Sequence, residues 1–204
     1  MTLKIAVMAS TKGTDLQAII EAIKKKELDA EIRIVIANKE CPAIERARNN
    51  GFKTKVVPYD KDKDTRENYD KKIAEMLDEE KIELIVLVGY MRLFSKWFVQ
   101  KYKNKIINIH PSLLPSFPGM GISVHQNILD YGCKVSGCTI HFVDEGMDTG
   151  PIIMQGTVEI EDNETADSLK EKVQALEKRL YPKVIHLFGQ GKIKVQNRKV
   201  FIDK

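Results

Sequence analysis

Regular alternation of strand-like and helix-like segments is the feature that most constrains the fold of this chain. The strongest strand signal is the run Leu84-Ile85-Val86-Leu87-Val88, which is apolar at every position. A strand that is apolar on both faces is typical of the buried centre of a parallel sheet. Between such strands lie segments whose apolar residues recur at helical spacing. The pattern predicts an α/β fold with a doubly wound, mostly parallel central sheet.

The second half of the chain is expected to be more mixed in strand direction than the first. The predicted strands are 5–8, 32–37, 53–57, 84–88, 106–109, 135–143 and 152–160, followed by a closing hairpin of 193–195 and 199–202. The predicted helices are 15–25, 42–49, 65–80, 95–102, 124–131 and 165–188. Because no repeat or linker interrupts this order, we expect a single domain over residues 1–204.

Composition argues against several classes of protein. The net charge is only +4, and basic and acidic residues alternate, as in Lys61-Asp62-Lys63-Asp64, so we expect no nucleic-acid partner. Cys41, Cys133 and Cys138 are odd in number and scattered, as expected for reduced thiols. The first residues lack a signal-peptide layout, and no apolar run approaches the ~18 residues of a membrane span. We therefore expect a cytoplasmic protein without a membrane partner.

Two polar residues interrupt an apolar strand in the segment 106–119. Asn108 and His110 are two positions apart, so their side chains should lie on the same face of the strand, just before Pro111. Open α/β sheets bind ligands at the carboxyl ends of their strands. An amide donor beside an imidazole suits a reaction in which negative charge develops on a carbonyl oxygen. The alternative is a turn asparagine beside a structural histidine.

A loop between the first strand and the first helix, Ser10 to Leu16, is a candidate phosphate site. Backbone N–H groups at a helix N-terminus, with the helix dipole behind them, favour an anion. The loop matches neither a Walker motif nor a dinucleotide fingerprint, and its only glycine is Gly13. The alternative is an ordinary N-cap, in which Thr14 or Asp15 satisfies the first amides of the helix.

An acidic, glycine-punctuated loop follows the strand that ends near His141. Its three carboxylates, Asp144, Glu145 and Asp148, form a solvated turn unless the sheet brings one of them beside His110 and so favours the charged imidazole. The histidines and Cys138 lack the spacing of metal ligands, so we expect no metal site.

Two of these segments carry a family resemblance. The block Asn-Ile-His-Pro-Ser-Leu-Leu-Pro at 108–115 and the block His-Phe-Val-Asp-Glu-Gly-Met-Asp-Thr-Gly-Pro at 141–151 resemble the two signatures of the folate-dependent phosphoribosylglycinamide formyltransferases. Residues 89–93 and 16–19 resemble further family segments, and the similarity follows the whole chain in order. The resemblance implies the formyltransferase fold, with a nucleotide- or phosphate-binding half at about 1–104 and a catalytic and folate-binding half at 105–204.

The resemblance also implies an activity. The family transfers a formyl group from 10-formyltetrahydrofolate, a co-substrate, to the amine of glycinamide ribonucleotide in purine synthesis. By position, Asn108 would donate to the oxyanion, His110 would be the general acid, and Asp148 would keep His110 protonated. The partners would be these two small molecules, and the chain would be a monomer or a homodimer.

The same resemblance predicts two binding regions. The folate contacts would be Arg66, Met91, Arg92, Leu93, Phe94, Asn108, Val143, Asp144, Glu145, Gly146, Met147 and Asp148. The ribonucleotide contacts would be Gly13, Thr14 and Asp15 at its phosphate, together with Glu177.

The chain departs from the family pattern in two places. Its phosphate loop reads Ser-Thr-Lys-Gly-Thr-Asp where the family has Ser-Gly-x-Gly-Ser-Asn, and the run after Gly119, Met120 to His125, is about two residues longer than usual.

Other readings remain open on sequence grounds. A formyltetrahydrofolate hydrolase shares the Asn/His/Asp set but carries an added N-terminal domain. A methionyl-tRNA formyltransferase would need a further C-terminal domain and a basic surface. A folate- or nucleotide-binding module without turnover is the reading from another class.

Overall fold

The strands form one large sheet and a small separate hairpin. The computed structural model describes residues 2–119 and 124–203. The large sheet contains β1 (Leu3–Ala9), β2 (Ala30–Ala37), β3 (Thr54–Val56), β4 (Leu84–Val88), β5 (Ile106–His110), β6 (Val135–Phe142) and β7 (Ile152–Glu159). The hairpin consists of β8 (Ile193–Gln196) and β9 (Lys199–Ile202). The predicted strands are confirmed to within a few residues at each end.

Strand direction changes part-way across the sheet. In the described residues the order is β3-β2-β1-β4-β5-β6-β7. The pairs from β3 to β5 are parallel, whereas β5–β6 and β6–β7 are antiparallel. The expectation of a doubly wound first half and a mixed second half is therefore confirmed. β4 lies between β1 and β5 and is buried at every position, as its uninterrupted apolar run predicts.

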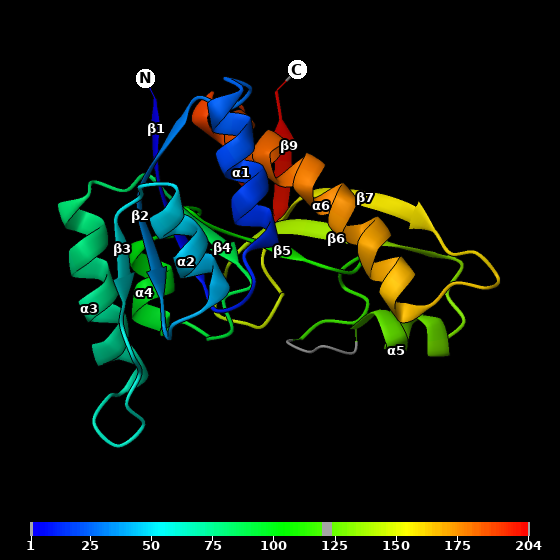
Figure 1. Ribbon diagram of the computed structural model, residues 1–204, viewed down its shortest axis with the longest axis horizontal. Coiled ribbons are helices and arrows are strands. Elements are labelled where there is room, and N and C mark those ends of the chain that lie inside the picture. The colour runs from blue at the N-terminus through cyan, green and yellow to red at the C-terminus, as the bar shows by residue number, and fades with distance from the viewer. Residues whose placement is uncertain (1, 120–123, 204) are drawn as a thin grey trace.

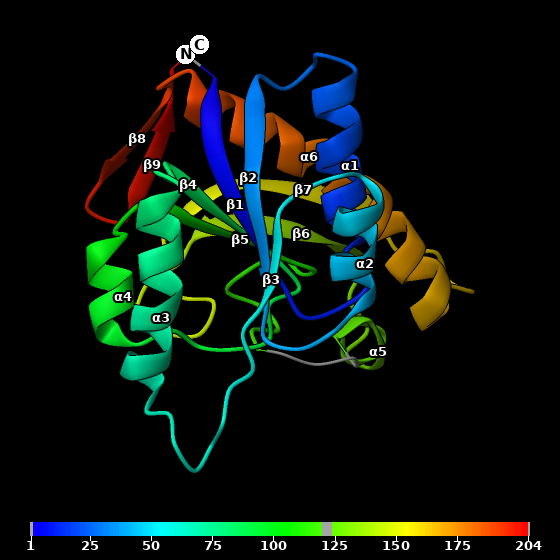
Figure 2. The ribbon, with the colours of Figure 1, turned by 60° about the vertical axis from the view of Figure 1, so that its left-hand side comes forward.

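Helices cover both faces of the sheet (Figure 1, Figure 2). They are α1 (Thr14–Lys24), α2 (Pro42–Asn49), α3 (Arg66–Glu79), α4 (Lys96–Lys101), α5 (Val124–Asp130) and α6 (Ala166–Gly189). In Figure 2, α3 and α4 lie on one side of the strands and α1, α2 and α6 on the other. Each layer encloses its own apolar core: α1, α2, α5 and α6 contribute to one, and α3 and α4 to the other.

The long helix α6 is fixed against the centre of the sheet by Tyr181. This side chain is fully buried, and its hydroxyl donates to the carbonyl oxygens of Leu87 (2.8 Å) and Ile107 (3.0 Å). Those carbonyls belong to β4 and β5, so one hydroxyl bridges two neighbouring strands of the sheet. A buried hydroxyl with acceptors in reach avoids the cost of an unsatisfied polar group.

The first helix, α1, is capped by a glycine and not by the side chain of Thr14 or Asp15. Gly13 is the N-cap of α1, its φ is 70°, and the N-cap position provides no side-chain hydrogen bond to the first amides of the helix. The suggestion that Thr14 or Asp15 provides an ordinary N-cap is therefore wrong. A Cβ at position 13 would approach Ala43 Cβ to 2.7 Å, so glycine is required both by φ and by space.

No helix among the described residues is long and apolar enough to cross a membrane. Residues 120–123 of the longer segment after Gly119 lie outside the described residues, so only its end, at Val124 and His125, is placed, where α5 begins.

Candidate active site

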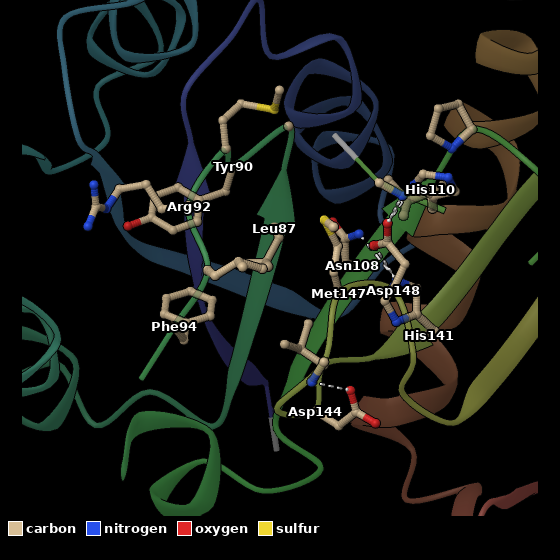
Figure 3. Close-up of a pocket in the computed structure, with 18 of the residues that line it drawn as sticks. Leu87, Tyr90, Arg92, Phe94, Asn108, His110, His141, Asp144, Met147 and Asp148 are labelled. Atoms are coloured by element: carbon tan, nitrogen blue, oxygen red, sulfur yellow. Dashed lines mark hydrogen bonds and ion pairs between the residues drawn. The ribbon is translucent and has the colours of Figure 1, made fainter. Parts of the chain in front are cut away.

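A cavity of about 220 Å³ opens at the carboxyl ends of β4 and β5 (Figure 3). Its walls come from β4 and the segment that follows it, from the end of β5, and from the loop between β6 and β7. This is the edge at which parallel α/β sheets bind ligands. The loop after β6 also reaches this place: β6 runs back along β5 and ends beside Ile106, and the loop that follows folds back so that Asp148 lies 3.4 Å from His110.

Asn108 and His110 both reach this cavity from β5, as their spacing predicts. In the antiparallel pairing with β6, Asn108 lies opposite His141 and His110 lies opposite Thr139. His110 is buried. An amide and an imidazole are therefore held side by side on a strand between two neighbours, where little backbone movement is available.

Each ring nitrogen of His110 faces an oxygen. Nε2 lies 2.9 Å from the carbonyl oxygen of Phe117, to which it can donate. Nδ1 lies 3.4 Å from Oδ2 of Asp148. A neutral ring can donate to only one of these oxygens, and a doubly protonated ring could donate to both.

Asp148 is held between two histidines and a backbone amide. Its Oδ2 accepts from Gly119 N–H at 2.8 Å, and its Oδ1 lies 3.6 Å from Nε2 of His141. Burial raises the pKa of the Asp148 carboxyl, but its contacts with His141 and Gly119 and the nearby ring of His110 outweigh burial, and the pKa is lowered below 3.8. The site therefore holds a carboxylate beside His110.

His141 is a site residue to which the sequence analysis assigned no role. Its Nδ1 lies 2.8 Å from the carbonyl oxygen of Phe142, to which it can donate. Nε2 lies 3.2 Å from Nδ2 of Asn108 and 3.6 Å from Oδ1 of Asp148. With the proton on Nδ1 it can accept from Asn108, and with a proton on Nε2 it can donate to Asp148. The register of β5 and β6 reveals this contact, and no local pattern in the sequence specifies that register.

The predicted folate contacts lie around this cavity, with one exception. The lining residues among them are Met91, Arg92, Leu93, Phe94, Asn108, Val143, Asp144, Glu145, Gly146, Met147 and Asp148. Arg66, at the start of α3, is not among the residues that line it. The side chain of Asp144 is held by two hydrogen bonds within the loop. Its Oδ1 accepts from Thr149 Oγ1 (2.6 Å) and from Gly146 N–H (3.1 Å).

Arg92 is oriented by two aromatic rings. Its guanidinium carbon lies 3.6 Å from the ring centre of Tyr59 and 4.7 Å from that of Tyr69. Figure 3 shows the Arg92 side chain extending away from Asn108 and His110. Cation–π contacts of this kind fix the direction of an arginine while leaving N–H groups available. Arg92 thus places positive charge at the end of the cavity remote from His110.

The predicted ribonucleotide contacts lie outside the cavity, at the start of α1 and on α6. Asp15 and Glu177 are both buried, with exposed fractions of 7% and 6%. Burial raises the pKa of Asp15 to about 6, against the lowering effect of Lys178. Burial and the charge of Asp15 likewise raise the pKa of Glu177. Two carboxyl groups thus share a buried region behind the loop that was predicted to bind phosphate.

Metal ligation finds no support in the side chains that are placed. Across residues 2–119 and 124–203, no group of three or more His, Cys, Asp or Glu side chains is arranged to hold a metal ion.

Comparison with known proteins places this geometry in a family. A family model described as formyl transferase matches residues 3–185. The chain belongs to the formyl transferase family. The carboxyl-edge cavity, with its asparagine, histidine and aspartate, is thus a feature of a formyl transferase domain.

Relatives of this formyl transferase include short and long proteins. A phosphoribosylglycinamide formyltransferase of Bacillus subtilis is 40% identical over 89% of this chain and 92% of its own length. A trifunctional purine biosynthetic protein of Gallus gallus is 40% identical over 94% of this chain, which spans only 19% of that protein. The solved structure of glycinamide ribonucleotide transformylase 1 from Symbiobacterium toebii has a TM-score of 0.93 and 36% identity, covering 100% of this chain and 95% of that one.

Proposed function

We propose that this chain transfers the formyl group of 10-formyltetrahydrofolate to the amine of glycinamide ribonucleotide, a step of purine biosynthesis. The observation that carries the proposal is that Asn108, His110 and Asp148, from two separate segments, line one cavity of a formyl transferase domain. Relatives that match nearly their full length to this chain carry the corresponding name.

The proposed reaction is a direct transfer between the two substrates. The neutral amine of the ribonucleotide attacks the formyl carbon, and a carbon–nitrogen bond forms while the carbonyl oxygen gains negative charge. The bond from that carbon to the folate nitrogen then breaks. The attacking amine loses one proton and the folate nitrogen gains one, so the products are the formylated acceptor and tetrahydrofolate.

Asn108 and His110 would stabilise the negative charge that develops on the formyl oxygen. One N–H of the Asn108 amide is directed to His141, which leaves the second for the oxyanion. His110, with Asp148 as its counter-ion, would add a positive charge and a transferable proton. Donors that are already oriented stabilise a transition state without reorganising during the reaction.

Besides acting as the counter-ion of His110, Asp148 would accept a proton during the reaction. A carboxylate within reach of both His110 and His141 can accept, through water, the proton that the attacking amine loses. We propose that the loop 143–148 and the segment 91–94 after β4 hold the folate, with Arg92 directed to its anionic end. Arg66 would contact the same end only from outside the cavity.

The acceptor would bind on the other side of the reacting carbon. We propose that Gly13, Thr14 and Asp15 contact its phosphate through backbone amides, because α1 begins without a side-chain cap, and that Glu177 contacts the ribonucleotide. Both partners are small molecules, and we place the reaction in the cytoplasm, where scattered cysteines stay reduced.

The test is turnover of a 10-formyl folate followed spectrophotometrically, with and without glycinamide ribonucleotide. Release of the deformylated folate only when the ribonucleotide is present, together with formylated ribonucleotide in equal amount, is the expected result. Release without the acceptor would assign a hydrolase instead. Folate binding without any release would assign a binding module.

A further inference from the structure

The segment after β5, residues 111–119, contacts both members of the His110–Asp148 pair through its backbone. We call it the proline loop, because three of its residues are prolines. The carbonyl oxygen of Phe117 lies 2.9 Å from Nε2 of His110. Gly119 N–H donates to Oδ2 of Asp148 at 2.8 Å. Figure 3 shows His110 and Asp148 lying next to each other at the cavity. The position of the proline loop therefore determines the surroundings of both side chains.

The Phe117 carbonyl is directed to His110 by an uncommon backbone conformation. The φ of Phe117 is 51°, in the left-handed region that residues with bulky side chains seldom adopt. A conformation of this kind persists only where surrounding contacts hold it. The peptide group that precedes Phe117 therefore needs a fixed partner.

The hydroxyl of Ser112 provides this partner. Its Oγ donates to the carbonyl oxygen of Ser116 at 2.6 Å, and this carbonyl belongs to the peptide group that precedes Phe117. The carbonyl oxygen of Phe117 itself lies 3.4 Å from the same Oγ. Ser112 is fully buried, so water does not compete for its hydroxyl. One side chain thus holds the turn whose carbonyl faces His110.

Ser112 is in turn anchored to the large sheet. Its carbonyl oxygen accepts from Oγ1 of Thr139 at 2.7 Å, and the same Oγ1 accepts from Leu114 N–H at 3.0 Å. Thr139 lies on β6, directly opposite His110 of β5. The histidine and the support of the proline loop are therefore fixed by the same pair of strands.

We propose that Ser112 is a positioning residue: it fixes the proline loop so that the Phe117 carbonyl holds the imidazole of His110. An acceptor at Nε2 limits rotation of the ring and keeps Nδ1 directed at Asp148. Neither Ser112 nor Phe117 lines the cavity, so Ser112 acts without touching a substrate. Its effect on turnover rests on the proposed function, whereas its effect on the His110 ring does not.

The kinetic test compares two serines of the same loop. Ser112→Ala should lower kcat roughly tenfold, because a misdirected imidazole lowers the population of the reactive geometry. The KM for the folate should change by less than about twofold, because no side chain that lines the cavity is altered. Ser116→Ala is the matched control, since it removes an exposed hydroxyl and leaves the carbonyl that accepts from Ser112. Both constants should stay at their wild-type values in the control.

Nuclear magnetic resonance of the protein without substrates reports on the His110 ring directly. An Nε2–H that donates to a carbonyl from a buried ring exchanges slowly with water and gives an observable signal, which is assigned by its loss in His110→Gln. We expect this signal in the wild type and in Ser116→Ala, and its loss through fast exchange in Ser112→Ala. A role of Ser112 in stability alone would lower Tm and leave the signal in place.

Three results would overturn the proposal. The first is a folded Ser112→Ala protein that keeps either the wild-type signal or the wild-type kcat. The second is an equal loss in Ser116→Ala, because the whole loop would then respond to any change. The third is the absence of the signal in the wild type, since the Phe117 carbonyl would then not accept from the ring.

Circular dichroism and Tm show whether the variants fold. If Ser112→Ala does not fold, Thr139→Val carries the test, because it removes the hydroxyl that holds the Ser112 carbonyl. Thr139→Ser, which retains a hydroxyl, is then the control and should keep the signal. A wild type that transfers no formyl group to glycinamide ribonucleotide would reject the proposed function, and the signal alone would then decide whether Ser112 positions His110.

Discussion

Nδ1 of His110 and Oδ2 of Asp148 lie 3.4 Å apart, although one residue ends β5 and the other lies in the loop between β6 and β7. β6 runs back along β5 and ends beside Ile106, so the contact depends on the loop after β6 folding back to bring Asp148 to the carboxyl edge of the sheet. The pair is thus brought together by strand topology and not by proximity in sequence. We propose that it takes part in the formyl transfer.

Replacing Asn108 by alanine should lower kcat roughly 10²–10³-fold, the usual effect of removing one oxyanion donor. His141 would lose its partner at Nε2, so Tm is measured alongside kcat. Asn127→Ala, on α5 and away from the cavity, is the control and should retain normal turnover. Near-normal kcat in a folded Asn108→Ala protein would exclude Asn108 from the reaction.

Replacing Asp148 by asparagine should lower kcat at neutral pH at least tenfold, because His110 loses its counter-ion. The change in folding stability should also depend on pH in a definite direction. The pKa of Asp148 is lowered in the folded state, so its contribution is present above pH 3.8 and is lost as the pH falls through the folded value. The variant should therefore be less stable than wild type at pH 7, with the difference vanishing in acid. A difference that does not vary with pH contradicts this account.

Replacing the buried Asp15 by asparagine should stabilise the protein at neutral pH. The pKa of Asp15 is raised from 3.8 to about 6, so its contribution to stability is fully present below pH 3.8 and is lost as the pH rises through about 6. The gain from Asp15→Asn should grow from near zero at low pH to roughly 1–3 kcal/mol at neutral pH. Urea unfolding at several pH values measures it. Asp29→Asn, at an exposed position, should show no such trend.

Replacing Tyr181 by phenylalanine should cost about 1–3 kcal/mol, because the carbonyl oxygens of Leu87 and Ile107 lose a buried donor. Chemical denaturation of the variant gives the value directly. The comparison is Tyr131→Phe, whose side chain is 81% exposed and whose loss of a hydroxyl should be close to neutral. Equal effects of the two changes would mean that the contacts of Tyr181 contribute nothing.

Much of the fold follows from sequence periodicity, and the site follows only in part. The apolar run of β4 and the spacing of Asn108 and His110 are local patterns, and both led to correct placements. The contact between Asn108 and His141 depends on strand register, which is set by packing across the whole sheet. The role of Gly13 as the N-cap was missed, because side-chain caps are the commoner solution at polar helix starts.

The predicted catalytic residues all line the cavity, whereas one of the predicted folate contacts does not. Residues 91–94 and 143–148 surround the cavity, whereas Arg66 does not line it. Arg66 begins α3, and its distance from the cavity depends on how the segment between β3 and α3 is folded, which no periodicity specifies.

The backbone of Asp148 restricts what can occupy this position during evolution or redesign. Its φ is 55°, in the left-handed region that asparagine, aspartate and glycine tolerate best. A longer acid at this position would combine backbone strain with a displaced carboxylate. Variation that preserves the loop should therefore pass through asparagine or glycine, both of which abolish the charge. An aspartate here is thus difficult to exchange gradually for any other acid.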